Sequence, residues 1–353
     1  MLSITEYLTQ AVEMGASDIH IISGHPVMVR NKGRLVAISE SFMMPEESKE
    51  LVFSMLNEQQ KEQLMDVGET DFAYSISKLA RFRVNAFRQR NSYAAAIRVV
   101  LTTPPDAETL GIPKEVIDLT NLRSGLVLVT GPTGSGKSTT LASLISHINR
   151  TKNENIITLE DPIEYLHRND KCIVSQREIG ADTQSYANAL RAALRQDPDV
   201  ILVGEMRDRE TISIALTAAE TGHLVFSTLH TVGAAKTIDR ITDIFEPFQQ
   251  PQVRTQLSTV LKGVVSQQLL PKADNSGRVA AFEIMFDSPA ISNNIREAKT
   301  YQINSAIQTG RARGMVSMDL SLAELVRKRI VDFDTALSYS VNHEHFDKIV
   351  KGL

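Results

Sequence analysis

The chain has little of what disulfide-rich and zinc-rich proteins use. Among 353 residues there is one cysteine, Cys172. A single cysteine excludes an internal disulfide framework and a zinc site built from several cysteines, and it fits a reducing compartment. We expect Cys172 to be a half-buried apolar side chain without a chemical role. The sequence also lacks a His-Glu-x-x-His pattern, so no zinc is expected.

Aromatic residues are scarce, and charge of either sign is not in large excess. Tryptophan is absent, aromatics make up 5% of the chain, and 38 basic against 42 acidic residues leave a formal charge of -4. Proteins that move along nucleic acid use basic grooves with aromatic side chains on which bases stack. This composition argues against a nucleic-acid translocase, and no nucleic-acid partner is expected.

Long apolar runs are missing as well. No stretch approaches 18 uninterrupted apolar residues, which is the length that a membrane-spanning helix needs. The first residues show no basic region followed by an apolar core, so no secretory signal is expected. Any contact with a membrane is therefore expected to be peripheral.

The first hundred residues predict a small α+β domain. Ser3 and Glu6 have the spacing of a helix capping box, and a helix is expected to begin there. Strands are expected at 18–22, 27–30, 71–76, 81–90 and 93–100, with a helix at 45–57. Alternation in 81–90 places Phe82 and Val84 opposite Arg81 and Arg83, so one face of this sheet is expected to be basic.

A polar, proline-bearing stretch then separates two domains. Residues 102–108 are expected to pack into neither domain, and we place a linker at 101–112 between domains at 1–100 and 113–353. In the second domain, short apolar runs at 126–129, 156–159, 200–203 and 224–228 alternate with helical patterns. This order predicts an α/β fold with a mostly parallel sheet and helices on both faces. From about residue 289 the pattern is helical.

A phosphate-binding loop follows the first of these strands and leads into a helix. It consists of Gly131, Pro132, Thr133, Gly134, Ser135, Gly136, Lys137 and Ser138, followed by Thr139. Glycines let the backbone amides surround phosphates, the lysine reaches the β and γ phosphates, and the Ser138 hydroxyl is offered to magnesium. ATP and Mg²⁺ are therefore the expected ligands.

Acidic or imidazole side chains follow the other strands. The carboxyl ends of parallel strands open onto one crevice, where Glu160, Asp161, Glu164, Glu205 and His230 are expected to converge. Glu205 is the candidate that polarises the attacking water. The carboxylates at 160–164 would hold magnesium waters or form a solvated acidic turn. His230 would sense the γ-phosphate, or it is a hydrogen-bonded core or surface residue.

Two further sets of side chains have open interpretations. His223, at the opposite end of its strand, is expected to be structural or to lie at a subunit contact. Arg81, Arg83 and Arg98 are either a solvated basic face or guanidinium groups brought to the γ-phosphate from another domain or subunit.

Four boxes in this order resemble the secretion-superfamily ATPases, specifically the PilT family of type IV pilus retraction motors. They are the phosphate loop at 131–139, an Asp box at 157–165, a Walker B box at 197–208 and a His box at 217–230. The resemblance extends over essentially the whole chain. It implies a PAS-like N-terminal domain, a RecA-like ATPase domain and a hexameric ring that powers twitching motility.

The resemblance also implies roles and partners. Glu164 would bind the metal water, Glu205 would act on the nucleophile, His230 would contact the γ-phosphate, and Arg83 and Arg98 would be the domain-borne arginines. Magnesium would be held by Ser138 and, through water, by Glu164. The motor would work in the cytoplasm at the inner face of the membrane, on an inner-membrane pilus platform protein.

The resemblance is incomplete near the C-terminus. The family's retraction motif has arginine and leucine where this chain has Ser292 and Asn294, although Arg296 and Glu297 match. This segment would couple hydrolysis to motion, or it is simple amphipathic helix. Open alternatives are a motor for pilus assembly, type II secretion or conjugation, and a scaffold that binds ATP without turnover. The missing cysteines argue against the zinc-bearing assembly and type II motors.

Overall fold

The structure is a computed structural model of the 353-residue chain that describes residues 2–31, 33–77, 79–100 and 103–352. The chain divides into two compact units. One consists of Met1–Thr103 with Glu164–Leu166, and the other of Pro104–Ile163 with His167–Leu353. Among the described residues, no helix combines the length and apolar character needed to cross a membrane.

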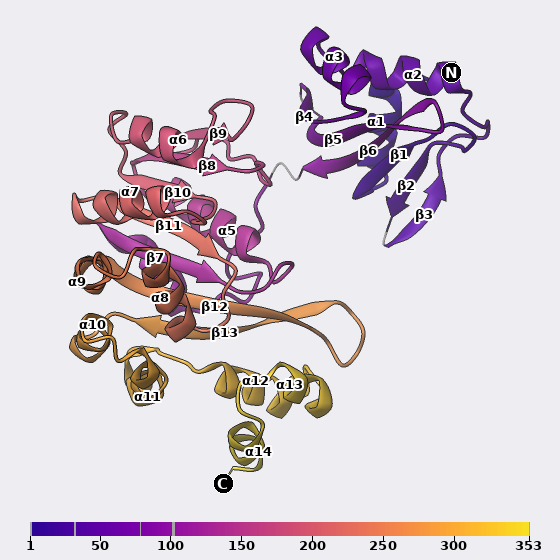
Figure 1. The fold of residues 1–353 in the computed structure, drawn as a ribbon. Helices are drawn as coiled ribbons and strands as arrows, with labels where there is room; N and C mark the ends of the chain where they lie inside the picture. The colour runs from indigo at the N-terminus through magenta and orange to yellow at the C-terminus, as the bar shows by residue number, and fades with distance from the viewer. Residues whose placement is uncertain (1, 32, 78, 101–102, 353) are drawn as a thin grey trace. The chain divides into compact units, whose positions relative to one another are not determined.

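The first unit is a six-stranded antiparallel sheet with three helices (Figure 1). Its strands are β1 (Asp18–Ile21), β2 (Met28–Asn31), β3 (Arg34–Ala37), β4 (Glu69–Ile76), β5 (Ala80–Gln89) and β6 (Ser92–Val100), in the order β3-β2-β1-β6-β5-β4. Its helices are α1 (Ile4–Glu13), α2 (Pro45–Ser54) and α3 (Glu58–Asp66). The predicted small α+β domain is therefore confirmed.

Local sequence explains most of this unit. The Ser3 side chain accepts a hydrogen bond from the Glu6 amide while the Glu6 carboxylate accepts one from the Ser3 amide, which is the predicted capping box at α1. Phe82 and Val84 are fully buried and Arg83 is exposed, so the predicted alternation in β5 is confirmed. Their burial defines which face of the sheet carries the core.

Two elements of this unit were not predicted. The helix expected at 45–57 is present as α2, which ends at Ser54. A second helix, α3, follows because Asn57 caps it: the Asn57 side chain accepts from the Gln60 amide at 2.9 Å and the Gln60 side chain accepts from the Asn57 amide at 3.0 Å. The edge strand β3 was missed because all of its residues are exposed and it therefore shows no burial alternation.

The second unit is a seven-stranded sheet in the order β13-β12-β7-β11-β10-β8-β9. Its strands are β7 (Gly125–Thr130), β8 (Asn155–Glu160), β9 (Ile173–Glu178), β10 (Val200–Val203), β11 (Leu224–Leu229), β12 (Leu261–Pro271) and β13 (Arg278–Phe286). All neighbours are parallel except the hairpin pair β12 and β13. The mostly parallel sheet predicted for the ATPase domain is confirmed.

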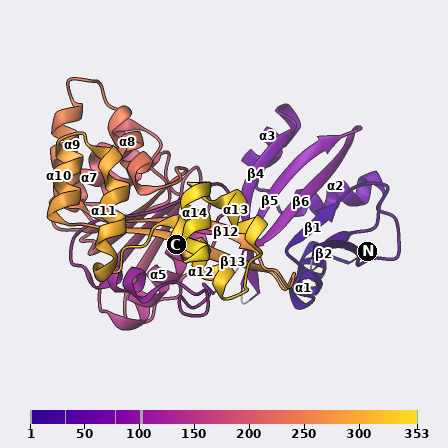
Figure 2. The same cartoon turned by 90° about the horizontal axis from the view of Figure 1, so that it is seen from below.

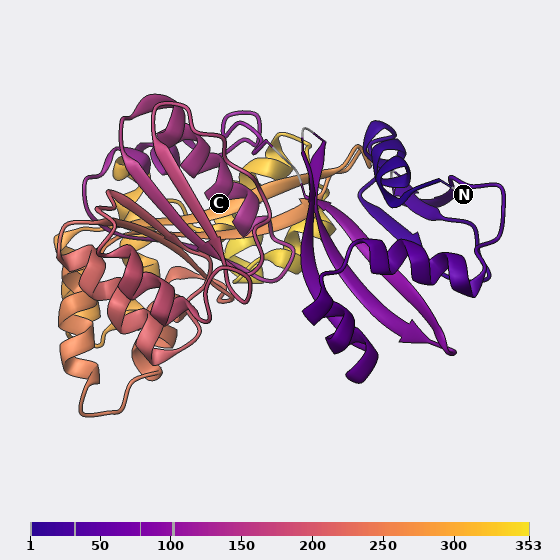
Figure 3. The same cartoon turned by 90° about the horizontal axis from the view of Figure 1, so that it is seen from above.

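Helices cover both faces of this sheet. They are α4 (Lys114–Ile117), η1 (Asp118–Asn121), α5 (Lys137–Thr151), α6 (Tyr186–Ala193), α7 (Arg209–Glu220), α8 (Ala234–Asp243) and α9 (Gln250–Val260). Leu144 of α5 packs with Val127 on one face, and Leu216 of α7 packs with Leu126 on the other. Figure 3 shows the strands between α5 on one side and the salmon-coloured helices on the other.

The chain after β13 is helical, as predicted. It forms α10 (Pro289–Arg296), η2 (Thr300–Gln302), α11 (Ile303–Thr309), η3 (Gly310–Arg313), α12 (Met318–Arg327), α13 (Phe333–Tyr339) and α14 (His343–Lys351). Helices α10 and α11 lie beside α8 and α9, whereas α12, α13 and α14 gather along β12 and β13 (Figure 2). This last group has its own core, which includes Leu322 and Phe346.

The segment after the first unit differs from the expected free linker. Residues 101 and 102 lie outside the described residues. Beyond them, Ala107 and Ile112 are buried in the core that contains α5, and the Pro105 carbonyl accepts a hydrogen bond from Ser143 at 2.6 Å. The expectation that 102–108 packs into neither domain is corrected, because Ala107 and, just beyond the stretch, Ile112 are apolar and bury in a core that includes α5.

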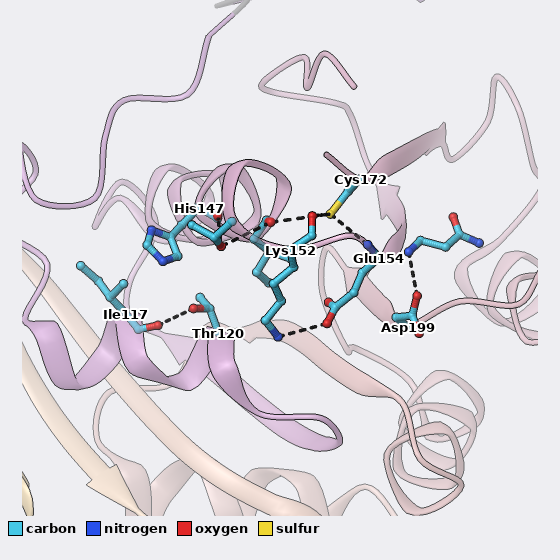
Figure 4. Close-up of polar contacts among 10 residues, drawn as sticks. Ile117, Thr120, His147, Lys152, Glu154, Cys172 and Asp199 are labelled. Atoms are coloured by element: carbon cyan, nitrogen blue, oxygen red, sulfur yellow. Dashed lines mark hydrogen bonds and ion pairs between the residues drawn. The ribbon is translucent and has the colours of Figure 1, made fainter. Parts of the chain in front are cut away.

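Cys172 lies in the second unit, next to the end of α5. It is 3% exposed, and its thiol contacts the Lys152 carbonyl at 3.2 Å and the Glu154 amide at 3.4 Å (Figure 4). Burial raises the pKa of this thiol. Cys172 is therefore a fully buried, protonated packing residue rather than the half-buried one expected from the sequence.

Candidate active site

The functional side chains of the second unit follow four neighbouring strands. Strand β7 leads into the phosphate loop, β11 into His230 and β10 into Glu205, and β8 ends at Glu160. The four strands are neighbours in the sheet order β7-β11-β10-β8. The four strands are parallel, so their carboxyl ends lie at one edge of the sheet. The convergence predicted from the sequence is therefore present for these groups.

The phosphate loop has the backbone that its glycines permit. Gly131, Gly134 and Gly136 have φ angles of 144°, 79° and 88°, which other residues rarely adopt. Gly136 is the N-cap of α5, so the amides of the loop and the positive end of the helix point to the same place. The arrangement is a nest of backbone donors suited to phosphate oxygens.

Lys137 lies within this nest. Its side chain is largely buried, and its ammonium group donates to the carbonyls of Gly131 at 2.9 Å and Pro132 at 3.0 Å. Ser138, by contrast, is exposed at the first turn of α5. The lysine charge is thus held inside the loop, while the Ser138 hydroxyl is open to a ligand.

Glu205, Arg207 and His230 form a cluster at the ends of β10 and β11. The Glu205 Oε2 atom lies 2.6 Å from Arg207 Nε and 3.7 Å from His230 Nε2. The Glu205 carboxylate is 13% exposed, whereas the Arg207 side chain is 74% exposed. A cavity of about 340 Å³ opens here, lined also by Thr228, Thr231 and Arg240. The carboxylate is therefore accessible from a real cavity.

His230 connects this cluster to the phosphate loop. Its Nδ1 lies 3.4 Å from the Thr133 hydroxyl, while its Nε2 faces Glu205. Burial and the positive charge of Lys137 lower the pKa of His230, and Glu205 only partly opposes them. The imidazole is therefore neutral at pH 7 and spans the space between the loop and the carboxylate.

Sequence reasoning missed Tyr186 of α6, which lies among the acidic groups. Its hydroxyl is close to Gly204, where a Cβ atom would come within 2.9 Å of it. Burial raises the pKa of Tyr186, and Glu205, Asp161 and Glu160 raise it further. The phenol therefore stays protonated at neutral pH beside the carboxylates. The local sequence around Tyr186 carries no signal for this position.

The three carboxylates of the acidic turn after β8 have different surroundings. Glu160 Oε1 accepts from Thr158 at 2.6 Å and from Gln176 at 3.2 Å, so it is part of the sheet's hydrogen-bonded network. Asp161 is exposed and is joined to Pro162 by a cis peptide. Glu164 is exposed too, and it belongs with the first unit. The phosphate loop and Glu205 belong to the other unit.

The candidate arginines also belong to the first unit. Arg83 of β5 lies directly opposite Arg98 of β6, and both are exposed. Arg98 Nε forms an ion pair with Asp18 Oδ1 at 2.9 Å. Arg81, on the same face as Arg83, is partly buried. The predicted basic face is therefore real, and part of it is neutralised by Asp18.

His223 has a local structural role. Its Nδ1 lies 2.9 Å from the Ala218 carbonyl, at the end of α7, and its own carbonyl accepts from the Gly125 amide. It thus joins α7, β11 and β7 at the edge of the sheet opposite to the site. This agrees with the structural interpretation of His223.

Comparison with known proteins gives the family. The model of the Type II/IV secretion system protein family matches residues 2–339. The chain belongs to this family. It is 47% identical to the Type IV pilus retraction ATPase PilT of Pseudomonas aeruginosa, over 98% of this chain and all of that protein. It is 49% identical to a twitching motility protein of Neisseria gonorrhoeae, over 90% of this chain and 85% of that protein.

Solved structures agree with the sequence comparison. A crystal structure of the pilus retraction motor PilT with bound ADP matches with a TM-score of 0.92 and 47% identity, over 99% of this chain and all of that one. The ATPase DotB of Legionella pneumophila matches with a TM-score of 0.79 and 29% identity, over all of this chain and 97% of that one. The resemblance to the pilus retraction ATPases and the predicted α/β fold are thus confirmed, and the chain is an ATPase of this family.

Proposed function

We propose that the chain is the ATP-hydrolysing motor that retracts type IV pili and so drives twitching motility. The observation that carries the proposal is the match, in sequence and fold, to a pilus retraction motor from end to end. By contrast, the chain spans 54% or less of the curated type II secretion relatives. These coverages favour a retraction motor over a type II secretion motor.

The phosphate loop supports the proposed binding of ATP. Loop amides, the N-terminus of α5 and the Lys137 ammonium together supply the donors that the β and γ phosphates need. The exposed Ser138 hydroxyl and Glu164, the latter through water, are the proposed magnesium contacts. Magnesium, when bound, neutralises the charge that develops on the β and γ phosphate oxygens.

Glu205 is the proposed group that acts on the attacking water. It is a carboxylate that follows a buried strand, it faces a cavity, and it pairs with Arg207, while His230 and Tyr186 beside it are neutral. A neutral His230 keeps both ring nitrogens available, one as donor and one as acceptor, between the γ-phosphate position and Glu205. The proposed role of His230 is to contact the γ-phosphate.

Arg83 and Arg98 are proposed to stabilise charge at the γ-phosphate from the N-terminal domain of the same or a neighbouring subunit. Two arginines directly opposite each other on adjacent strands repel, so such a pair favours an anion nearby. A homo-oligomeric ring, which we propose to be a hexamer, would supply several such sites. In this proposal the N-terminal domain is the unit that ends at Thr103, and the ATPase domain is the unit that begins at Pro104.

The proposed place of work is the cytoplasm, at the inner face of the cytoplasmic membrane. The partner there is the pilus platform protein of the inner membrane, reached by peripheral contact. The nearly balanced charge and the few aromatic residues support a protein partner over a nucleic acid.

Deletion of the gene tests the proposal. Retraction predicts cells with excess surface pili that have lost twitching motility, and complementation by the wild-type gene but not by Lys137→Ala restores motility. Lys137→Ala removes the ammonium of the phosphate loop and should lose ATP binding in the purified protein. Cells without pili would instead indicate a motor for assembly, and normal pili with normal twitching would contradict the proposal.

A further inference from the structure

The phosphate loop rests on a residue from a strand far away in the sequence. Gln267 of β12 is 4% exposed, and its Nε2 donates to the Ser135 carbonyl at 2.7 Å. Its Oε1 accepts from the Thr140 hydroxyl at 2.7 Å. One side-chain amide therefore joins the middle of the loop to the first turn of α5.

The hydrogen-bond chemistry fixes the orientation of this amide. A backbone carbonyl can only accept, so the NH₂ group of Gln267 must face Ser135. The oxygen is then left to accept from the Thr140 hydroxyl, which can donate. Asparagine is one methylene shorter and glutamate has no donor when ionised, so neither reproduces both hydrogen bonds of this glutamine.

Two glycines of the phosphate loop lie in close contact with strand β12. Strand β12 lies beside β7 in parallel register, with Ser266 opposite Thr130, so Gln267 lies beside the start of the loop. A Cβ atom on Gly131 would lie 2.2 Å from the Gln267 carbonyl oxygen, and one on Gly136 would lie 2.9 Å from Gln267 Nε2. Both glycines thus permit close approach of the loop to β12, in addition to supplying positive φ angles.

The residues on either side of Gln267 face other parts of the unit. Ser266 Oγ accepts from the Gly233 amide at 2.9 Å, at the N-terminus of α8, a few residues beyond His230. Gln268 Nε2 donates to the Tyr339 carbonyl at 3.2 Å, at the end of α13. Because strand side chains alternate, Gln267 alone faces the phosphate loop, and Gln268 is a natural control of the same residue type.

We propose that Gln267 is a positioning residue of the phosphate loop, which holds Ser135 and the first turn of α5 in the conformation that binds the phosphates of ATP. It acts through the loop and touches no nucleotide atom. The inference rests on the proposed role of the loop, which Lys137→Ala tests separately. Loss of Gln267 leaves the buried Ser135 carbonyl without its donor and the loop free to relax away from the phosphate-binding geometry.

The experiment measures ADP affinity by calorimetry and the kinetics of ATP hydrolysis on the purified full chain. Gln267→Met, which keeps the length but removes both hydrogen-bonding groups, should raise the Kd for ADP and the KM for ATP about tenfold, with kcat changed about threefold or less. Gln268→Met should leave all three values at the wild-type level. If Gln267 served stability alone, Gln267→Met would lower the melting temperature without this split between KM and kcat.

A second variant adds a pH signature. In Gln267→Glu, the ionised carboxylate repels the Ser135 carbonyl, whereas the protonated acid can donate to it. The ADP affinity of this variant, relative to wild type at the same pH, should therefore recover as the pH falls from about 8 to about 6. An affinity ratio independent of pH would contradict the proposed hydrogen bond.

The outcomes separate the inference from the function on which it rests. If Lys137→Ala loses ADP while Gln267→Met binds it within twofold of wild type, the inference is overturned and the phosphate site stands. If Lys137→Ala binds ADP normally, both are overturned. Should Gln267→Met fail to fold, Thr140→Val removes one of the two hydrogen bonds and should raise the Kd about threefold, and no change there overturns the inference.

Discussion

Arg207 and His230 both contact the same oxygen of Glu205. Arg207 Nε lies 2.6 Å and His230 Nε2 lies 3.7 Å from Glu205 Oε2, while the carboxylate faces the cavity at the ends of β10 and β11. An alanine at position 205 would remove the carboxylate and would also leave Arg207 and His230 without their contact. An amide of the same shape is the sharper substitution, because it keeps the position but cannot take a proton.

We therefore expect Glu205→Gln to bind ADP with wild-type affinity and to lose turnover about 10²-fold or more. The residue is proposed to act on water, so the loss should appear in kcat and in single-turnover hydrolysis alike. Glu210→Gln is the matched control, since Glu210 is exposed at the start of α7 and pairs with Arg191. Near-normal hydrolysis by Glu205→Gln would remove Glu205 from the mechanism.

The second prediction concerns the charge on His230. Burial and the Lys137 ammonium lower its pKa, so its titration midpoint should lie below the ordinary value of about 6.5. In Lys137→Met the midpoint should move upward, because a positive charge that opposes the imidazolium has been removed. NMR of ¹³C-labelled histidine, assigned with His230→Gln, measures both midpoints. Lys152→Met, at the far end of α5, should leave the midpoint where it was.

The sequence predicted the strands that carry the site, but it could not predict what supports them. Runs such as 200–203 are apolar on both faces, and the acid that follows them is visible in the sequence. Strand β12 also lies between two neighbours, yet its centre is Ser266, Gln267 and Gln268, which interrupt the apolar pattern. Their burial depends on partners up to 132 residues away, which no local pattern contains.

The same reason explains the other differences. Arg207 lies within the Walker B box at 197–208, but its contact with Glu205 arises from the turn after β10 and not from residue type. Tyr186 lies in an ordinary amphipathic helix, and only the fold brings it to the carboxylates. A local signal such as the capping box of Ser3 was predicted correctly because its partner, Glu6, is near in the sequence.

The third prediction is a dependence of stability on pH through His167. Burial lowers the pKa of this imidazole to about 4, against about 6.5 in the unfolded chain. Between these values the unfolded state binds the proton and the folded state does not, so stability falls as the pH decreases below about 6.5. From pH 7 to pH 5 this single group should remove about 2 kcal/mol of the free energy of unfolding.

Replacement by glutamine removes the titration. Urea unfolding followed by circular dichroism should show that His167→Gln loses about 2 kcal/mol less than wild type between pH 7 and pH 5. The exposed His25 provides the control, and His25→Gln should follow the wild-type dependence. Parallel curves for wild type and His167→Gln would show that this imidazole is not buried in its neutral form.

The fourth prediction concerns Arg83, one of the two candidate arginines. Asp18, Arg98 and Arg83 stand in register across β1, β6 and β5, and Asp18 already pairs with Arg98. In the part of the chain that the structure describes, no carboxylate pairs with Arg83. We therefore expect Arg83→Ala to lower kcat about 10³-fold with ADP affinity unchanged, as for an arginine that meets charge only in the transition state. Arg34→Ala, on the exposed strand β3, should hydrolyse ATP normally, and the same result for Arg83→Ala would make this face a solvated one.

The last prediction concerns coupling, and it starts from the packing of α10. Ile291 and Ile295 are each 1% exposed and belong to the core of the second unit. Asn294, which stands where the family has leucine, is also buried, and Arg296 is exposed at the last turn. The apolar side chains of the segment are thus buried in the core, and the exposed Arg296 side chain is available to contact a partner.

Arg296→Ala should therefore separate motion from hydrolysis. The side chain contributes no phosphate contact and no core packing, so ring assembly and at least half of the wild-type ATPase rate should remain, while twitching motility is lost. Light scattering, steady-state hydrolysis and surface motility of a strain carrying the variant measure the three properties. Arg278→Ala, another exposed arginine at the start of β13, should retain all three.

Each departure from this pattern has its own meaning. Equal loss of hydrolysis and motility would assign Arg296 to the ring or to catalysis, since a partner contact outside the site cannot change the rate of an isolated ATPase. Full motility would show that the segment does not transmit force in this protein. In that case α10, which differs from the family at Ser292 and at the buried Asn294, would serve only to pack against α9.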